Sequence, residues 1–124
     1  MNIRVYYDDT DAGGVVYHAN YLKFCERARS ELFFSHGKSL AIDGGHFVVK
    51  KVEADFKKSA KLGDLLHVKS TLVALHNASL HVKQTIYKGE EIIFEMTSLL
   101  AFVKEGKPTR IDEESKAFFR AVLS

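Results

Sequence analysis

Apolar residues follow two different spacings along this chain, and the change of spacing divides the sequence into a helical and a β-rich part. Between residues 21 and 36 they recur three and four positions apart, which is the period of an α-helix that buries one face. These residues are Tyr21, Phe24, Cys25, Ala28 and Leu32. Asn20 is a candidate N-cap and Gly37 a candidate C-terminal stop. The pattern predicts one long helix whose apolar stripe must be covered by another layer.

From residue 47 onward the spacing is that of β-strands, as where Leu80, Val82 and Ile86 alternate with polar residues. Strands are predicted at 2–7, 47–56, 65–75, around 80–86 and at 92–103. Short hairpin turns are predicted at 61–64, 76–79 and 88–90, a loop at 8–19 and a terminal amphipathic helix at 112–122. The strand at 92–103 is apolar on both faces, which predicts a central strand or a subunit interface.

Composition narrows the class of protein. The 124 residues predict a single domain, 1–124, and 46% hydrophobic with 27% charged residues is typical of a globular protein. A net charge of +2 is too small to indicate a nucleic-acid partner. The first residues lack the apolar core of a signal peptide, so a cytoplasmic location is expected. A single cysteine excludes an internal disulfide and a cysteine-rich zinc site.

Candidate chemistry gathers just before the predicted helix. Within a few residues the sequence places Asp11, two glycines, His18 and the positive end of a helix. Such an arrangement suits attack on a carbonyl whose oxygen must be stabilised as it gains negative charge.

The residues that carry this chemistry also resemble a known family. The run Thr10-Asp11-Ala12-Gly13-Gly14-Val15-Val16-Tyr17-His18-Ala19-Asn20-Tyr21, with Glu26-Arg27-Ala28-Arg29 behind it, resembles the hotdog-fold thioesterases of the 4-hydroxybenzoyl-CoA thioesterase type. Among these, the chain looks most like the YbgC-type acyl-CoA thioesterases associated with the Tol-Pal system. The resemblance covers nearly the whole chain and includes a turn at 59–64.

The resemblance implies an α+β hotdog fold, in which a five-stranded antiparallel sheet wraps a long helix. It also implies a homodimer whose sheets join edge to edge, often paired again into a homotetramer, with active sites between subunits. Coenzyme A enters as part of the acyl-CoA substrate, so no metal and no separate cofactor is expected.

By position in the motif, Asp11 matches the family's catalytic carboxylate, and the backbone N–H of His18 matches the donor that polarises the thioester carbonyl. YbgC-like members imply Tyr7, Asp11 and His18 as the catalytic set. Ala12 and His18 depart from the 4-hydroxybenzoyl pattern, which has a proline and an aromatic residue at these positions. The departure favours an aliphatic, fatty acyl-CoA.

The chemistry leaves two roles open for Asp11, which can attack as a nucleophile to give a mixed anhydride or act as general base for water. Tyr7 is expected to hydrogen-bond Asp11. His18 can steer water or assist the departing thiolate. The predicted substrate-binding residues are Gly13, Gly14, Val15, Lys57 and Lys58, the glycines for close backbone approach and the lysines for the phosphates of coenzyme A.

Other polar residues have simpler interpretations. Asp8 and Asp9 are expected to be solvated turn acids. Cys25 lies on the apolar stripe and is predicted to be a buried packing thiol. Arg27 and Arg29 are left open between pairing with helix glutamates and a role in the dimer.

The predicted function is therefore hydrolysis of acyl-CoA to a free acid and coenzyme A, in fatty acid metabolism. A hotdog hydratase or dehydratase is the first alternative, but its motif has prolines around a histidine and this chain has only Pro108. A non-catalytic acyl-binding or scaffold protein is the second. Acyl chain length, acyl carrier protein as a second thiol carrier, and peripheral association with membrane-linked proteins stay open.

Overall fold

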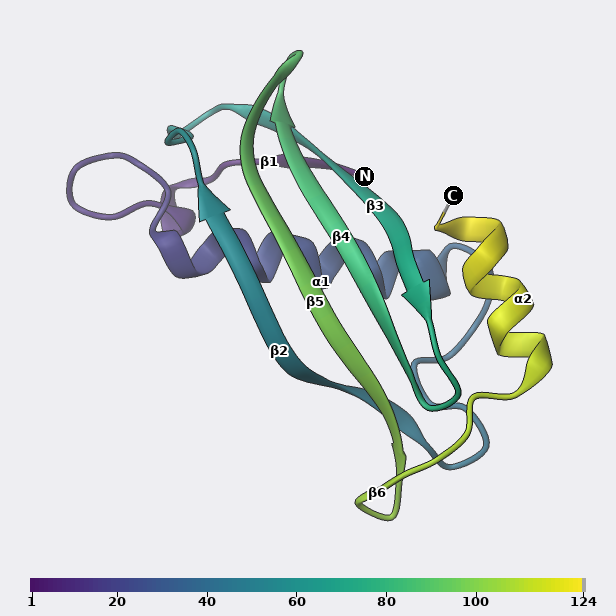
Figure 1. The fold of residues 1–124 in the computed structure, drawn as a ribbon. Coiled ribbons are helices and arrows are strands. Elements are labelled where there is room, and N and C mark those ends of the chain that lie inside the picture. Colours follow the sequence, from purple (N-terminus) through teal and green to yellow (C-terminus); the bar gives the residue numbers. More distant parts are fainter. Residues whose placement is uncertain (124) are drawn as a thin grey trace.

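The structure, a computed structural model, describes residues 1–123 and contains two α-helices, a 3-10 turn and six strands in those residues (Figure 1). In chain order they are β1 Asn2–Arg4, η1 Tyr7–Asp9, α1 His18–Phe34, β2 His46–Phe56, β3 Leu65–Leu75, β4 Ser79–Lys88, β5 Glu91–Lys104, β6 Lys107–Pro108 and α2 Glu113–Val122. No helix among these residues is long and apolar enough to cross a membrane.

All strands belong to one antiparallel sheet with the order β1-β3-β4-β5-β2, and β6 pairs with the end of β5. β5 lies between β4 and β2, which confirms the central strand predicted from its two apolar faces. Among residues 1–123 the hydrogen-bonded partner of β2 is β5 alone, so in this part of the chain the other edge of the 11-residue strand is open.

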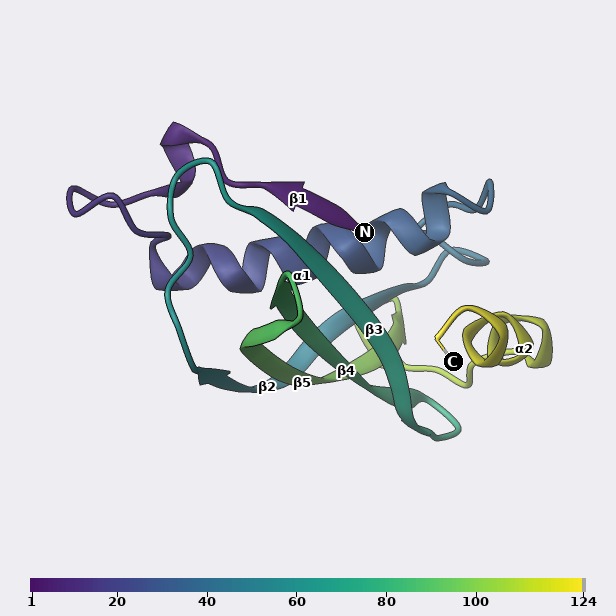
Figure 2. The ribbon, with the colours of Figure 1, turned by 90° about the horizontal axis from the view of Figure 1, so that it is seen from above.

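α1 lies across one face of the curved sheet, and α2 lies beside the sheet toward the C-terminal end of α1 (Figures 1 and 2). The predicted stripe is the buried side of α1, because Tyr21, Phe24, Cys25 and Ala28 all pack in the core. A second core cluster joins the sheet to α2 through residues such as Phe119 and Leu100. The helix therefore rests on two apolar clusters, one near each end.

Several predicted boundaries were wrong near the N-terminus. The first strand ends at Arg4, and α1 begins at His18 with Tyr17 as its N-cap, inside the predicted loop. Asn20 is not the cap. Its side chain lies in the first helical turn and donates a hydrogen bond of 2.8 Å to the carbonyl of Asp9. The Tyr17 N–H also donates to Asp9, and these tertiary bonds fix an earlier helix start than the apolar spacing indicated.

The segment at 61–64 is a turn but does not join neighbouring strands, as the hairpin prediction required. β2 and β3 lie on opposite sides of the β4–β5 pair, so residues 57–64 cross from one part of the sheet to another (Figure 1). The predicted hairpins at 76–79 and 88–90 do connect paired strands. β6 was missed because a two-residue strand carries no recognisable pattern.

Candidate active site

The loop between η1 and α1 holds Asp11 at the start of a tight turn. The Gly14 N–H donates to the Asp11 carbonyl at 3.1 Å, and the Gly13 N–H donates to Asp11 Oδ1 at 2.8 Å. Gly14 has φ of +79°, and a Cβ on Gly13 would lie 3.2 Å from Asp11 Oδ1. The two glycines thus shape the turn that presents an exposed carboxylate.

This loop is tied to the connection at 57–64 and through it to α1. The Val16 N–H donates to the Ala60 carbonyl at 2.9 Å, and the Ala60 N–H donates to the Tyr21 hydroxyl at 2.9 Å. Burial of the Tyr21 ring raises the pKa of its hydroxyl, with a smaller contribution from the Asp64 carboxylate. Tyr21 therefore remains neutral as the acceptor that joins the loop, the connection and the helix.

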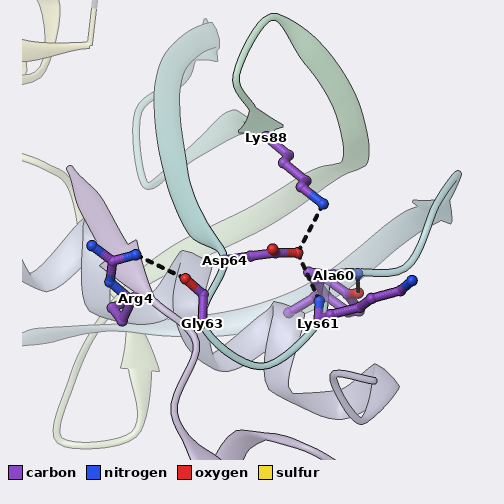
Figure 3. Close-up of polar contacts among 7 residues, drawn as sticks. Arg4, Ala60, Lys61, Gly63, Asp64 and Lys88 are labelled. Carbon is purple, nitrogen blue, oxygen red and sulfur yellow. Dashed lines mark hydrogen bonds and ion pairs between the residues drawn. The ribbon is translucent and has the colours of Figure 1, made fainter. Parts of the chain in front are cut away.

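The turn at 61–64 is itself held by polar contacts (Figure 3). Asp64 Oδ2 accepts from the Lys61 N–H at 2.8 Å and lies 3.1 Å from Lys88 Nζ, while Arg4 donates to the Gly63 carbonyl at 2.8 Å. Desolvation pushes the pKa of Asp64 up, but the Lys61 hydrogen bond and the Lys88 ammonium outweigh it and hold the pKa below its ordinary value. The turn is thereby fixed to β1 and β4.

The first turn of α1 offers backbone donors beside this loop. Tyr17 as N-cap makes no side-chain capping bond, and no acidic residue lies in the first turn. The first N–H groups of a helix lack partners within the helix and carry its positive partial charge. His18 is the first helical residue, with its exposed ring 4.4 Å from Tyr17 and 6.3 Å from Phe56 between ring centroids.

Two residues near Asp11 differ from expectation. The Tyr7 ring is 83% exposed, and the hydrogen bond expected between Tyr7 and Asp11 is absent from residues 1–123. Asp9 was wrongly predicted to be solvated, because it is buried and its Oδ2 accepts from the Tyr6 N–H at 2.9 Å. Asp8 is exposed as predicted. Asp9 thus folds the turn, whereas Asp11 faces solvent.

The two predicted phosphate-binding lysines lie at the end of β2 and pair with carboxylates. Lys57 Nζ lies 3.2 Å from Asp55 and 3.9 Å from Glu95, and Lys58 pairs with Glu91. Exposed ion pairs of this kind contribute at most about 1 kcal/mol, so a phosphate can compete for both lysines.

Behind the site, Cys25 is a packing residue as predicted. It is fully buried, and burial raises the pKa of its thiol to about 12, so it is not a nucleophile at neutral pH. Arg29 pairs with neither helix glutamate. Its Nη1 donates to Gln84 Oε1 at 2.8 Å instead. Gln84 was missed, although a polar residue among the alternating apolar positions of its strand was a visible sign of a buried polar role.

The chain is similar to known proteins in both fold and sequence. A family model for the thioesterase superfamily matches residues 13–94. The chain belongs to the thioesterase superfamily. This membership and the arrangement of helix and sheet confirm the predicted hotdog fold.

Individual relatives agree with the family. The acyl-CoA thioesterase YbgC of Haemophilus influenzae is 41% identical over 123 residues, covering 94% of this chain and 90% of that protein. The acyl-CoA thioesterase YbgC of Helicobacter pylori is 47% identical over 87 residues, 70% of this chain and only 65% of that protein. The crystal structure of a probable thioesterase from Bartonella henselae has a TM-score of 0.80 and 37% identity, covering 90% of this chain and 96% of that one.

Proposed function

We propose that the protein hydrolyses acyl-CoA to a carboxylic acid and coenzyme A. The observation that carries the proposal is similarity along nearly the whole chain to a relative named acyl-CoA thioesterase, 41% identical over 94% of the chain. The polar end of α1 supports it, because an exposed carboxylate and an uncapped helix start lie on either side of one short loop.

In the proposed reaction the thioester carbonyl oxygen faces the first turn of α1. As the carbonyl carbon becomes tetrahedral, its oxygen gains negative charge, which the N–H of His18 and the helix dipole stabilise. The carbon–sulfur bond then breaks, and the thiolate leaves and takes a proton to give the free thiol.

Asp11 supplies or activates the attacking oxygen. As a nucleophile it forms a mixed anhydride that water then hydrolyses, and as a base it removes a proton from attacking water. Its Oδ1 is held by the Gly13 N–H, which supports a fixed orientation for either role. Label in Asp11 after a single turnover in isotopically labelled water would establish the anhydride route, because general-base catalysis cannot place solvent oxygen in Asp11.

The remaining predicted site residues take supporting roles. The His18 ring assists the departing thiolate, and Tyr7 presents its exposed hydroxyl to substrate or to a neighbouring subunit. The backbone of Gly13, Gly14 and Val15 lies along the substrate. Lys57 and Lys58 bind the phosphates of coenzyme A.

The open edge of β2 supports a homodimer in which two sheets join through this strand. An unprotected edge of 11 residues is a template for pairing with another strand, and natural proteins cover such edges. Light scattering after size exclusion tests the dimer and its further pairing into a tetramer.

An aliphatic acyl group, use of acyl carrier protein, lack of a metal and a cytoplasmic location stay predictions from the sequence.

The first experiment measures thiol release from acyl-CoAs of increasing chain length, with the wild type beside Asp11→Asn. Asparagine keeps the size of the side chain and an oxygen for the Gly13 N–H, but cannot act as base or nucleophile. We expect the rate to fall by about 10²–10⁴. The matched control is Asp8→Asn, an exposed neighbour whose rate should match the wild type.

Equal rates for Asp11→Asn and the wild type would remove Asp11 from the mechanism. Absence of wild-type turnover with every coenzyme A and acyl carrier protein thioester would contradict the proposed function and favour an acyl-binding role.

A further inference from the structure

A cavity of about 390 Å³ lies away from the proposed active site, between the C-terminal half of α1, the sheet and α2. Its size is within the range of small-molecule sites, roughly 300–1,000 Å³. Most of its wall is apolar. The residues that define it include Leu32, Phe33, Phe47, Leu80, Leu100 and Phe119.

One charged group in this wall lacks an anionic partner. Arg29 lines the cavity, and within residues 1–123 its one hydrogen bond is the donation from Nη1 to Gln84 Oε1, with no ion pair. Gln84 is fully buried and is itself held by the Cys25 carbonyl at 2.8 Å and Ser70 Oγ at 3.0 Å. This neutral network fixes the position of the guanidinium without pairing it to a carboxylate.

A guanidinium carries five N–H donors, so most of those on Arg29 are available to a ligand. Burial lowers the pKa of Arg29, a sign that the cation has lost much of its hydration. The acid in the cavity wall, Glu26, is exposed and forms no ion pair with Arg29 among the described residues, although its carboxylate partly offsets the lowering of the Arg29 pKa. A partly desolvated cation in an apolar wall favours an anionic ligand with an apolar body.

We propose that this cavity binds a free aliphatic carboxylate, a medium-chain fatty acid, with its carboxylate on Arg29 and its chain between the sheet and α2. The apolar wall contacts the alkyl chain, and the planar guanidinium matches the carboxylate by two parallel hydrogen bonds. Since an apolar cavity of about 150 Å³ holds benzene, this cavity has room for a chain of about ten carbons.

Within one chain the cavity is separate from the proposed thioester site. Neither Asp11 nor His18 lines the cavity, and the first helical residue in its wall, Glu26, lies about 12 Å along the helix axis from His18. Because binding needs no turnover, its test does not depend on the thioesterase function.

Calorimetric titration of the wild type with decanoate, decan-1-ol and decyltrimethylammonium tests the proposal. Decanoate should bind, the alcohol more weakly, and the cation not at all. Arg29→Gln keeps a donor for Gln84 but removes the charge, and should weaken decanoate binding about ten- to hundredfold with little effect on decanol. Arg27→Gln, an exposed arginine on the same helix, is the matched control.

Ser30→Phe places a ring in the cavity and should abolish binding of decanoate while hydrolysis of a short acyl-CoA is unchanged. This variant also tests the proposal if Arg29→Gln fails to fold. Saturating coenzyme A, or Asp11→Asn, should leave decanoate affinity unaltered. Equal affinity for decanoate and decanol, unchanged affinity in folded Arg29→Gln or Ser30→Phe, or displacement of decanoate by coenzyme A would overturn the proposal.

Discussion

At its N-terminal end α1 meets solvent through an uncapped turn and the exposed Asp11 carboxylate, whereas its C-terminal half lies between the sheet and α2 around an apolar cavity. At the site end the loop that carries Asp11 is held by hydrogen bonds, such as those from Val16 to Ala60 and from Ala60 to Tyr21, beside the apolar packing of Tyr21 in the core. The cavity end is held by aromatic packing, with Phe119 against Phe33 and Phe47.

The difference suits the two proposed sites at the two ends of one helix. Directional bonds fix polar groups in place while leaving them accessible to a reacting ligand. Apolar contacts have no direction and are roughly proportional to the area removed from water, so they suit a site that excludes water. Substitutions at one end should therefore change catalysis, and substitutions at the other should change stability and ligand binding.

The largest effect on stability is expected at the cavity end. Phe119→Ala removes a buried ring and should lower the free energy of unfolding by about 3–5 kcal/mol. Urea denaturation measures this change, with the half-buried Phe118→Ala as a control of smaller effect. Thiol release per folded molecule should be unchanged. A large loss in activity of folded Phe119→Ala would show that the two ends are coupled.

Separate substitutions of the two glycines in the Asp11 turn distinguish the position of the Asp11 carboxylate from the stability of the fold. In Gly13→Ala the new Cβ crowds Asp11 Oδ1, and displacement of the carboxylate should lower kcat about ten- to hundredfold. In Gly14→Ala the new Cβ meets no neighbour, but alanine must adopt the positive φ of this position. We expect a loss of about 1–2 kcal/mol in unfolding free energy. If Gly13→Ala kept full activity, the position of the Asp11 carboxylate would not control the reaction.

A smaller, pH-dependent effect is expected at Asp64. Because the folded state lowers the pKa of this carboxyl below 3.8, its contribution to stability is present above that value and is lost as the pH falls through the folded pKa. Asp64→Asn should therefore be less stable than the wild type at neutral pH, by less than about 1 kcal/mol. The difference should vanish in acid. Denaturation at several pH values measures it, and a constant difference would exclude the ion pair with Lys88 as its cause.

No alkylation of Cys25 is expected while the protein is folded. With its pKa raised to about 12, the thiol should resist iodoacetamide at pH values where the urea-unfolded chain is alkylated at once. Mass spectrometry measures the extent of Cys25 alkylation. Alkylation of the folded and unfolded chains at similar rates would mean that the middle of α1 is open to solvent.

Local sequence patterns predicted much of the fold. The bounds of β3 agree with the predicted 65–75, and the stripe from Tyr21 to Ala28 is the buried side of α1. These two predictions are confirmed because the spacing of apolar residues along the chain reflects which face of a helix or strand is buried. The start of α1 was missed because it depends on bonds from Tyr17 and Asn20 to Asp9, which no local pattern reports.

At the proposed active site, the sequence by itself determined that Asp11, the glycine turn and the helix that follows lie within a few residues of one another. Only the tertiary structure decided that Asp9 is buried, that Ala60 joins the loop to Tyr21, and that Arg29 meets Gln84 in a cavity wall. Arg29 and Gln84 are 55 positions apart, and pairing across that distance is set by the order of strands in the sheet. Short-range chemistry is a property of the sequence, whereas burial and long-range polar contacts arise when the helix packs on the sheet.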